Sequence, residues 1–350
     1  MGDILHALPA VTALRLAHPT WQIGWVVDPR WQALLKAGTE GTRIREQGTE
    51  IGAGRGSAMP VVDRLHFAST RAWKRHPLTV KTAAEINALR RELCAANYGA
   101  VVDLQGAIRS AAIVRLAGCP RRIGEAKPRE WPAQWLFTER VRTHGAHVIE
   151  QDVELASAVA GDTLTPAEPL LPVDPDAESW CDAWLAASFA GEARPIALVA
   201  PGAGWGAKRW PPERYAVVAE GLKQRGFHVL ANSGPSEEHL AATIKAGGAA
   251  VTLTTTLPQL IALTRRIALC IAGDTGPLHL ACALGRPVVG IYGPTDPSRN
   301  GPFGTRAKVL RCPGSRRDHK RRAAPDPGLL TIAPEDVLRA ADELLAEVRA

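Results

Sequence analysis

Short apolar runs alternate along the chain with longer stretches in which apolar residues recur at helical spacing. The pattern predicts strands at 23–27, 64–67, 100–104, 195–200, 228–231, 267–272 and 288–292. It predicts helices at 4–17, 82–96, 108–116, 212–225, 236–246, 258–264, 277–284 and 335–348. Strands that alternate with helices in this way indicate parallel sheets built from βαβ units.

A proline-rich segment divides this pattern into two halves. Residues 163–175 contain four prolines in thirteen positions, which suits a linker better than a helix. The length of 350 residues predicts about two domains. We expect two doubly wound, Rossmann-like α/β domains facing across a cleft, at 1–165 and 177–350, joined by a linker at 166–176. Ligands of such sheets bind at the carboxyl ends of the strands, so the chemistry is expected there.

The composition is that of an ordinary globular protein, with 46% hydrophobic and 22% charged residues. The sequence contains neither an apolar run long enough to span a membrane nor a signal-peptide pattern at Met1. Its six cysteines lack paired CxxC spacing, which favours reduced thiols over disulfides or a zinc site. We therefore expect a cytoplasmic protein without a metal centre.

The net charge of +7 indicates anionic partners. Part of the excess lies in residues 306–322, which carry eight Lys or Arg and one acid, Asp318. This basic cluster fits a solvated loop, or contact with an acidic substrate or a membrane surface. Nucleic acid is not expected as a partner because no aromatic residues are interspersed with the charges.

The segment 271–281 is the strongest candidate for chemistry. A buried strand ends in Gly273-Asp274-Thr275-Gly276, and a helix begins at Pro277. Free amides at such a helix start favour a phosphate, to which Thr275 can add a hydroxyl. Asp274 suits sugar hydroxyls better than an anion. The alternatives are that Asp274 or Thr275 only caps the helix, and that His279 is a packed helix residue.

A second glycine-rich loop follows the strand at 195–200. Gly202 and Gly204 permit close approach of a ligand to the backbone, and Lys208 can stabilise a leaving diphosphate. The alternative for Lys208 is a solvated loop lysine. Gly202-x-Gly204-x-x-Ala207 also fits a loose dinucleotide fingerprint, but the next helix begins too late for it.

Further polar residues follow or precede other predicted elements. Glu238 near a helix start can bind a ribose or merely favour the helix dipole. Asp3 precedes a helical run and can be a cap or a catalytic base. Asp103 and Gln105 lie near a strand end that faces the expected cleft.

The chain resembles the family 9 glycosyltransferases, the lipopolysaccharide heptosyltransferases, in six segments that run in family order. They are Met1–Pro9, Trp25–Asp28, Val101–Gly106, Lys208–Pro211, Gly273–His279 and Tyr292–Pro297. The second and third of these are more similar to heptosyltransferase I than to II. The resemblance implies a GT-B fold and an inverting, metal-independent transfer of heptose from ADP-L-glycero-D-manno-heptose to an anionic Kdo-lipid A acceptor. It implies no cofactor, and it allows peripheral contact with the cytoplasmic face of the inner membrane.

The resemblance also implies roles for single residues. Asp3 would be the base that deprotonates the acceptor hydroxyl. Donor binding falls to Gly202, Gly204, Lys208, Glu238, Asp274, Thr275, Gly276 and His279. Among these, Lys208 would stabilise the diphosphate, Glu238 would bind the ribose and Asp274 would hold heptose hydroxyls. We expect the acceptor to be bound by Asp103, Gln105 and Arg109.

The chain departs from the family pattern at its start. Family members carry a strand and a Ser-rich turn before the Met-Gly-Asp segment, whereas here Met1 is that methionine. We therefore expect the first parallel strand to be absent and a sheet edge to be open. Our hypothesis is a start assigned too late, which an intact-mass measurement of the native protein would test.

Three other functions remain as alternatives. The first is another GT-B hexosyltransferase or a nucleotide-sugar epimerase. The second is a non-catalytic protein that binds a nucleotide sugar or lipid A. The third is a nicotinamide-dependent dehydrogenase, based on the glycines of the 200–211 loop, which an NAD titration would test.

Overall fold

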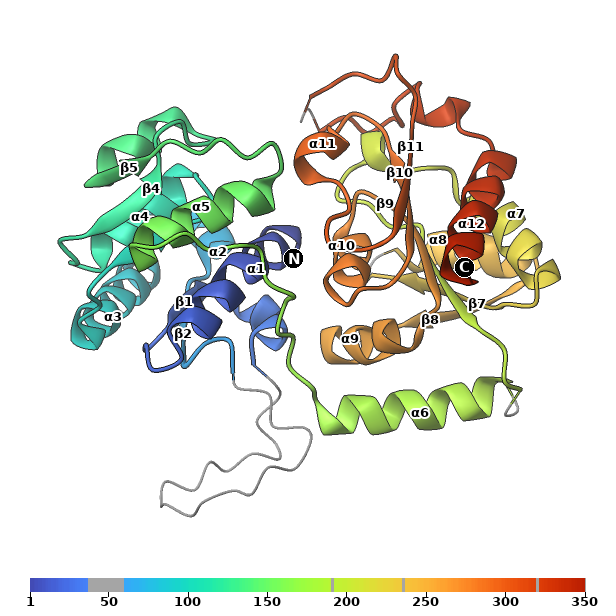
Figure 1. The fold of residues 1–350 in the computed structure, drawn as a ribbon, viewed down its shortest axis with the longest axis horizontal. Coiled ribbons are helices and arrows are strands. Elements are labelled where there is room, and N and C mark those ends of the chain that lie inside the picture. Colours follow the sequence, from blue (N-terminus) through green and yellow to red (C-terminus); the bar gives the residue numbers. More distant parts are fainter. Residues whose placement is uncertain (37–59, 190–191, 235–236, 319–320, 350) are drawn as a thin grey trace. The chain divides into compact units, whose positions relative to one another are not determined.

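The computed structural model describes residues 1–36, 60–189, 192–234, 237–318 and 321–349. The chain divides into two compact units (Figure 1). One comprises Met1 and Asp3–Pro172, and the other comprises Gly2 and Val173–Ala350. Each unit is built from parallel strands and helices.

The C-terminal unit contains one parallel sheet of six strands. These are β6 (Ile196–Ala200), β7 (His228–Ser233), β8 (Ala250–Thr254), β9 (Leu269–Gly273), β10 (Val288–Tyr292) and β11 (Ala307–Arg311). Their order is β8-β7-β6-β9-β10-β11, the doubly wound order of a dinucleotide-binding domain. The direction of winding changes between β6 and β9, which makes the carboxyl ends of these two strands the expected ligand site.

Helices cover both faces of this sheet (Figure 1). Helices α7 (Pro212–Gln224), α8 (Glu238–Ala246) and α12 (Pro334–Arg349) share one core cluster with residues such as Val199 and Ile271. Helices α9 (Leu257–Arg266) and α10 (Gly276–Ala283) lie on the other face. Because both faces of the sheet are covered, the central strands such as β9 and β10 are buried and continuously apolar, as the sequence pattern indicated.

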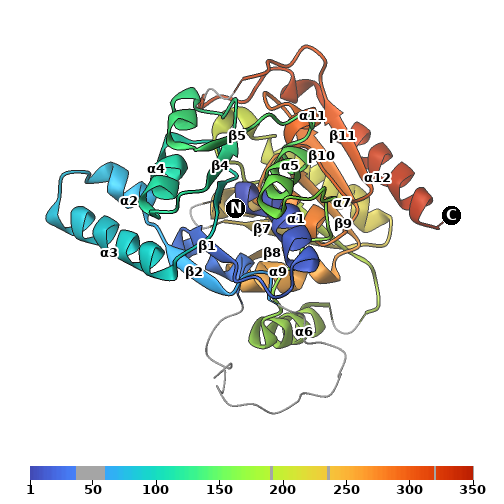
Figure 2. The same ribbon diagram turned by 60° about the vertical axis from the view of Figure 1, so that its left-hand side comes forward.

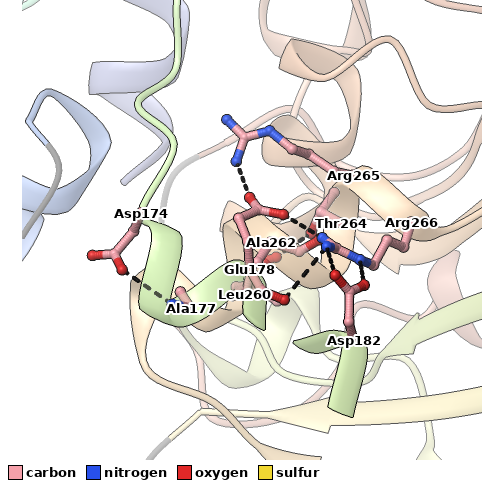
Figure 3. A network of polar contacts seen from close by, with 9 residues as sticks. All are labelled: Asp174, Ala177, Glu178, Asp182, Leu260, Ala262, Thr264, Arg265 and Arg266. Carbon is pink, nitrogen blue, oxygen red and sulfur yellow. Dashed lines mark hydrogen bonds and ion pairs between the residues drawn. The ribbon is translucent and has the colours of Figure 1, made fainter. Parts of the chain in front are cut away.

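Helix α6 (Pro175–Phe189) packs on α9 through an ion-pair network (Figure 3). Glu178 accepts hydrogen bonds from the guanidinium groups of Arg265 and Arg266. Asp182 binds Arg266 through both carboxylate oxygens, at 2.6 and 2.8 Å. Asp174 caps the helix by accepting a 3.0 Å hydrogen bond from the amide of Ala177. The first helix after the proline-rich segment is thereby fixed to the C-terminal unit.

The N-terminal unit contains two separate parallel sheets. One pairs β1 (Gly24–Val27) with β2 (Arg64–Phe67), and the other joins β3 (Val101–Asp103), β4 (Arg122–Glu125) and β5 (Glu139–Val141). Among the described residues, β1 and β3 do not pair with each other.

Helices surround these two sheets (Figure 2). Helix α1 (Gly2–Ala17) runs beside α5 (Val148–Ala160), and Ala10 and Leu14 of α1 form a core cluster with Val153 and Ala156 of α5. The unit is completed by α2 (Thr70–Arg75), α3 (Val80–Ala96), α4 (Ile108–Leu116) and the 3₁₀ helices η1 (Pro29–Leu34) and η2 (Trp131–Leu136).

The predicted strands and helices are confirmed to within a few residues. The pattern missed α2, α5, α6, β4, β5, β8, β11 and the short helix α11 (Pro297–Asn300). Helix α6 begins at Pro175, within the segment expected as linker, because proline is well tolerated in the first helical turn. Strand β11 contains Lys308 and Arg311, whose charges hide its apolar pattern. Ser236, the first residue of the helix predicted at 236–246, lies outside the described residues.

Candidate active site

Three predicted residues meet at the carboxyl ends of β6 and β9. Lys208 ends the 3₁₀ helix η3 (Gly206–Lys208) after β6, and its ammonium is paired with Oδ2 of Asp274, which follows β9. Nε2 of His279, on α10, lies 2.9 Å from Oδ1 of the same carboxylate. All three side chains are at most 10% exposed. The structure therefore places a compact charged cluster at the switch point of the sheet.

The electrostatics of Asp274 favour its ionised form. Burial by itself raises the pKa of this carboxyl, but the hydrogen bond from His279 and the attraction of the Lys208 ammonium outweigh it. The net result is a pKa held well below its ordinary value. The Lys208 ammonium also lies 4.2 Å from the ring centre of Trp205, a favourable cation–π distance.

The start of helix α10 carries no side-chain cap. Thr275 occupies the N-cap position, yet its hydroxyl donates to the carbonyl of Gly273 at 3.2 Å. The Asp274 carboxylate is engaged by Lys208 and His279. The alternative in which either side chain merely caps the helix is therefore not what the structure shows. Backbone amides at the start of a helix are suited to an anion, here from Gly276 onward.

The glycine-rich loop after β6 is held by a carboxylate that the sequence did not single out. Oε1 of Glu237 accepts a hydrogen bond from the amide of Ala203 at 3.2 Å. A Cβ on Gly202 would lie 2.3 Å from Oε2 of Glu237 and would displace that carboxylate, whereas Gly204 faces open space. Glu238, the predicted ribose ligand, is the first residue of α8. The only sequence feature that could have pointed to Glu237 is its position next to Glu238.

In the N-terminal unit, Asp3 and Gln105 come together although they are 102 positions apart. Nε2 of Gln105 donates to Oδ2 of Asp3 at 2.8 Å. Asp3 is exposed in the first turn of α1, where a carboxylate is favoured by the helix dipole.

Asp103 is buried beneath this pair and organises the loop that presents Gln105. Its Oδ1 accepts from the amides of Gln105 and Gly106 at 2.9 and 3.2 Å, and its Oδ2 accepts from the hydroxyl of Ser110 at 2.9 Å. Burial raises the pKa of Asp103, although these hydrogen bonds oppose the shift. Both carboxylate oxygens are thus used within the protein. Arg109, the third expected acceptor ligand, is exposed on α4.

Much of the 306–322 basic cluster is engaged within the C-terminal unit. Lys308 pairs with Glu343 and Glu347, and Arg322 pairs with Asp318. The Arg311 guanidinium donates to three backbone carbonyls, those of Gly293, Ser315 and Arg316. Lys320 lies outside the described residues. For these three of the cluster's seven described cations, the contacts favour a structural role over contact with an acidic partner.

Among the residues that the structure describes, no group of three or more His, Cys, Asp or Glu side chains is arranged to hold a metal ion. The same part of the chain contains no helix that is both long and apolar enough to cross a bilayer.

Comparison with known proteins places these features in a family. The model of glycosyltransferase family 9 (heptosyltransferase) matches residues 86–326, more than half of the chain. The chain is 29% identical over 341 residues to lipopolysaccharide heptosyltransferase 1 of Escherichia coli O18:K1:H7, covering 90% of each protein. It is 27% identical over 319 residues to lipopolysaccharide heptosyltransferase 1 of Pseudomonas aeruginosa, covering 87% of this chain and 79% of that protein.

Solved structures share the fold over nearly the whole chain. A glycosyl transferase of family 9 from Veillonella parvula has a TM-score of 0.79 at 20% identity, covering 99% of this chain and 95% of that one. The E. coli heptosyltransferase WaaC with ADP has a TM-score of 0.74 at 24% identity, covering 98% and 97%. The chain therefore has the GT-B fold, and it belongs to glycosyltransferase family 9, the heptosyltransferases.

Proposed function

We propose that this glycosyltransferase transfers heptose from ADP-L-glycero-D-manno-heptose to a Kdo-lipid A acceptor, as a step in lipopolysaccharide inner-core synthesis. The observation that carries the proposal is the buried Lys208–Asp274–His279 cluster at the β6/β9 switch point. The matched relatives in E. coli and P. aeruginosa are lipopolysaccharide heptosyltransferases, and one solved relative is a complex with ADP.

The donor is proposed to bind in the C-terminal unit. Backbone amides at Thr275 and Gly276 face the diphosphate, and Lys208 supplies the positive charge that stabilises it as it leaves. Asp274, held ionised, accepts hydrogen bonds from heptose hydroxyls, and His279 fixes its orientation. Gly202 and Gly204 let the nucleotide approach the backbone, and Glu238 binds the ribose. Glu237 holds the loop in place.

Asp3 is proposed as the base of an inverting, metal-independent transfer. As the acceptor oxygen bonds to the anomeric carbon, its proton passes to the Asp3 carboxylate, and the bond from that carbon to the diphosphate oxygen breaks to release ADP. Gln105 occupies Oδ2 of Asp3, so Oδ1 is the oxygen proposed to accept the proton. Lys208 provides the charge stabilisation that a divalent cation provides in other transferases.

The acceptor is proposed to contact Gln105 and the cationic Arg109, with Asp103 acting through the loop that carries Gln105. Because this acceptor is embedded in lipid, the protein is proposed to act at the cytoplasmic face of the inner membrane and to bind there peripherally.

The proposal is tested by mass spectrometry of Kdo-lipid A after incubation with the protein and ADP-heptose. We expect the mass of one heptose to be added by the natural chain and no addition by Asp3→Ala, while calorimetry shows ADP binding by both. Comparable transfer by Asp3→Ala would contradict the assignment of the base. ADP binding without transfer by the natural chain would favour a different donor sugar or acceptor, or a binding protein.

A further inference from the structure

Two tryptophans project from the surface of the N-terminal unit. Trp131 and Trp135 on η2 are 62% and 63% exposed, and their rings meet edge to face with centroids 4.7 Å apart. The opposite side of the same segment is anchored in the core, where Ala133 and Phe137 pack with Ala111 of α4. The backbone that carries the exposed rings is therefore fixed to the core. Large apolar side chains that gather on a protein surface commonly mark a binding site.

This aromatic pair is connected to the loop beside Asp3. The amide of Glu130 donates to the carbonyl of Gly106 at 2.9 Å, and the carboxylate of Glu130 accepts from the amide of Ile108 at 2.9 Å. Ile108 is itself 44% exposed. The segment before η2 is thus hydrogen-bonded to the start of α4, where Ile108 adds an exposed apolar side chain next to the loop that presents Gln105.

The surroundings of the pair are strongly positive. Residues 106–145 contain eight Lys or Arg and three acids. The acids are engaged locally: Glu125 by the hydroxyl of Thr143, Glu130 by the amide of Ile108, and Glu139 by Arg121. Three exposed cations flank the pair without an ion pair among the described residues: Arg109, Lys127 and Arg129. Rigid indoles beside unpaired cations match the boundary of an anionic bilayer, where indoles prefer the headgroup level.

We propose that the Trp131–Trp135 pair and its flanking cations dock the N-terminal unit on an anionic phospholipid bilayer. The inference rests on the proposed function, because an acceptor embedded in lipid requires the Asp3 end of this unit to reach the membrane. A second exposed apolar segment lies at the start of α3, where Leu78 is 98% and Val80 is 88% exposed. The tryptophan pair is the stronger anchor because its rings are large, interfacial and held from beneath.

The test is sedimentation of the full chain with vesicles that contain neither acceptor nor donor. Phosphatidylglycerol–phosphatidylethanolamine vesicles are compared with phosphatidylcholine vesicles. We expect Trp131→Ser/Trp135→Ser to weaken partitioning into the anionic vesicles roughly tenfold or more, from the loss of buried ring area. Lys127→Glu should weaken it roughly fivefold, an effect that added salt diminishes. Because no heptose transfer is measured, failure of the proposed function would leave this result intact.

A control removes a tryptophan pair with the same spacing of four residues on a helix of the C-terminal unit. Trp180 and Trp184 stack on α6, and Trp180→Ser/Trp184→Ser should partition as the natural chain does. Thermal unfolding of each variant shows that it is folded. Unchanged binding by the Trp131/Trp135 variant, equal binding to neutral vesicles, or no vesicle binding by the natural chain would each overturn the proposal. So would loss of binding in Leu78→Ser/Val80→Ser alone.

Discussion

At the scale of single residues, Lys208 and Asp274 depend on each other because both charges are buried. Replacing Lys208 by alanine removes the cation proposed to face the leaving diphosphate. We expect heptose transfer to slow roughly 10²–10³-fold, the usual cost of losing one stabilising group. Single-turnover kinetics at saturating donor measure this step. Lys208→Arg, which keeps the charge, is the control, and a near-normal rate in Lys208→Ala would remove this residue from the site.

Asp274 gives the C-terminal unit a pH dependence whose sign is fixed by its environment. Its folded pKa lies below the ordinary value of 3.8, so its ionised form stabilises the folded state above that pH. That stabilisation is lost as the pH falls through 3.8 toward the folded pKa. We expect Asp274→Asn to lower the free energy of unfolding by about 3 kcal/mol at pH 7, because it leaves Lys208 buried without its anion.

Urea unfolding of both proteins at several pH values measures the difference. The difference in the free energy of unfolding between the natural chain and Asp274→Asn should become smaller as the pH falls from about 5 to 3. A gap that stays constant over this range would contradict a stabilising ionised Asp274.

Asp103 is expected to act on catalysis through Gln105, which it positions. Asp103→Ala frees the amides of Gln105 and Gly106 and should reduce kcat about tenfold or more, with a small change in the KM for ADP-heptose. Asp103→Asn keeps an oxygen for both amides and should restore most of the activity. Steady-state kinetics separate kcat from KM. An equal loss in the alanine and asparagine variants would argue against positioning through these amides.

At the scale of elements, the apolar pattern was sufficient for strands that are buried on both faces, such as β9 and β10. It was insufficient for β11, where charged residues lie on an edge strand, and for α6, where four nearby prolines indicated a linker. The Asp274 segment was predictable because a strand, a glycine turn and a helix start are adjacent in sequence. The pairing of Asp3 with Gln105 and the role of Glu237 depend on tertiary contacts, which no local pattern encodes.

The attachment of α6 to α9 can be tested by removing its central carboxylate. Glu178 is only 19% exposed and serves both Arg265 and Arg266 (Figure 3). We expect Glu178→Ala to lower the free energy of unfolding by about 1–2 kcal/mol, since two charge-assisted hydrogen-bond partners are lost. Chemical denaturation measures it. Glu192→Ala, which breaks the exposed pair with Arg194, should change stability by no more than about 0.5 kcal/mol. Equal losses of stability in Glu178→Ala and Glu192→Ala would mean that the buried network stabilises the protein no more than an exposed ion pair does.

At the scale of the whole molecule, the two units are built with unequal cores. The C-terminal unit has one sheet of six strands, whereas the strands of the N-terminal unit fall into sheets of two and three. Larger continuous burial favours a more stable unit. We therefore expect two unfolding transitions in calorimetry, with the C-terminal unit unfolding at the higher temperature.

Addition of ADP should separate these transitions further, because every residue proposed to bind the donor lies in the C-terminal unit. A ligand that binds only the folded state at about 100 times its Kd adds about 2.7 kcal/mol, which corresponds to roughly 5–10 °C for a unit of this size. The lower transition should not move. Lys208→Ala should reduce the shift of the upper one. If ADP instead moved the lower transition, the nucleotide would bind in the N-terminal unit, and the assignment of donor residues to the ends of β6 and β9 would fail.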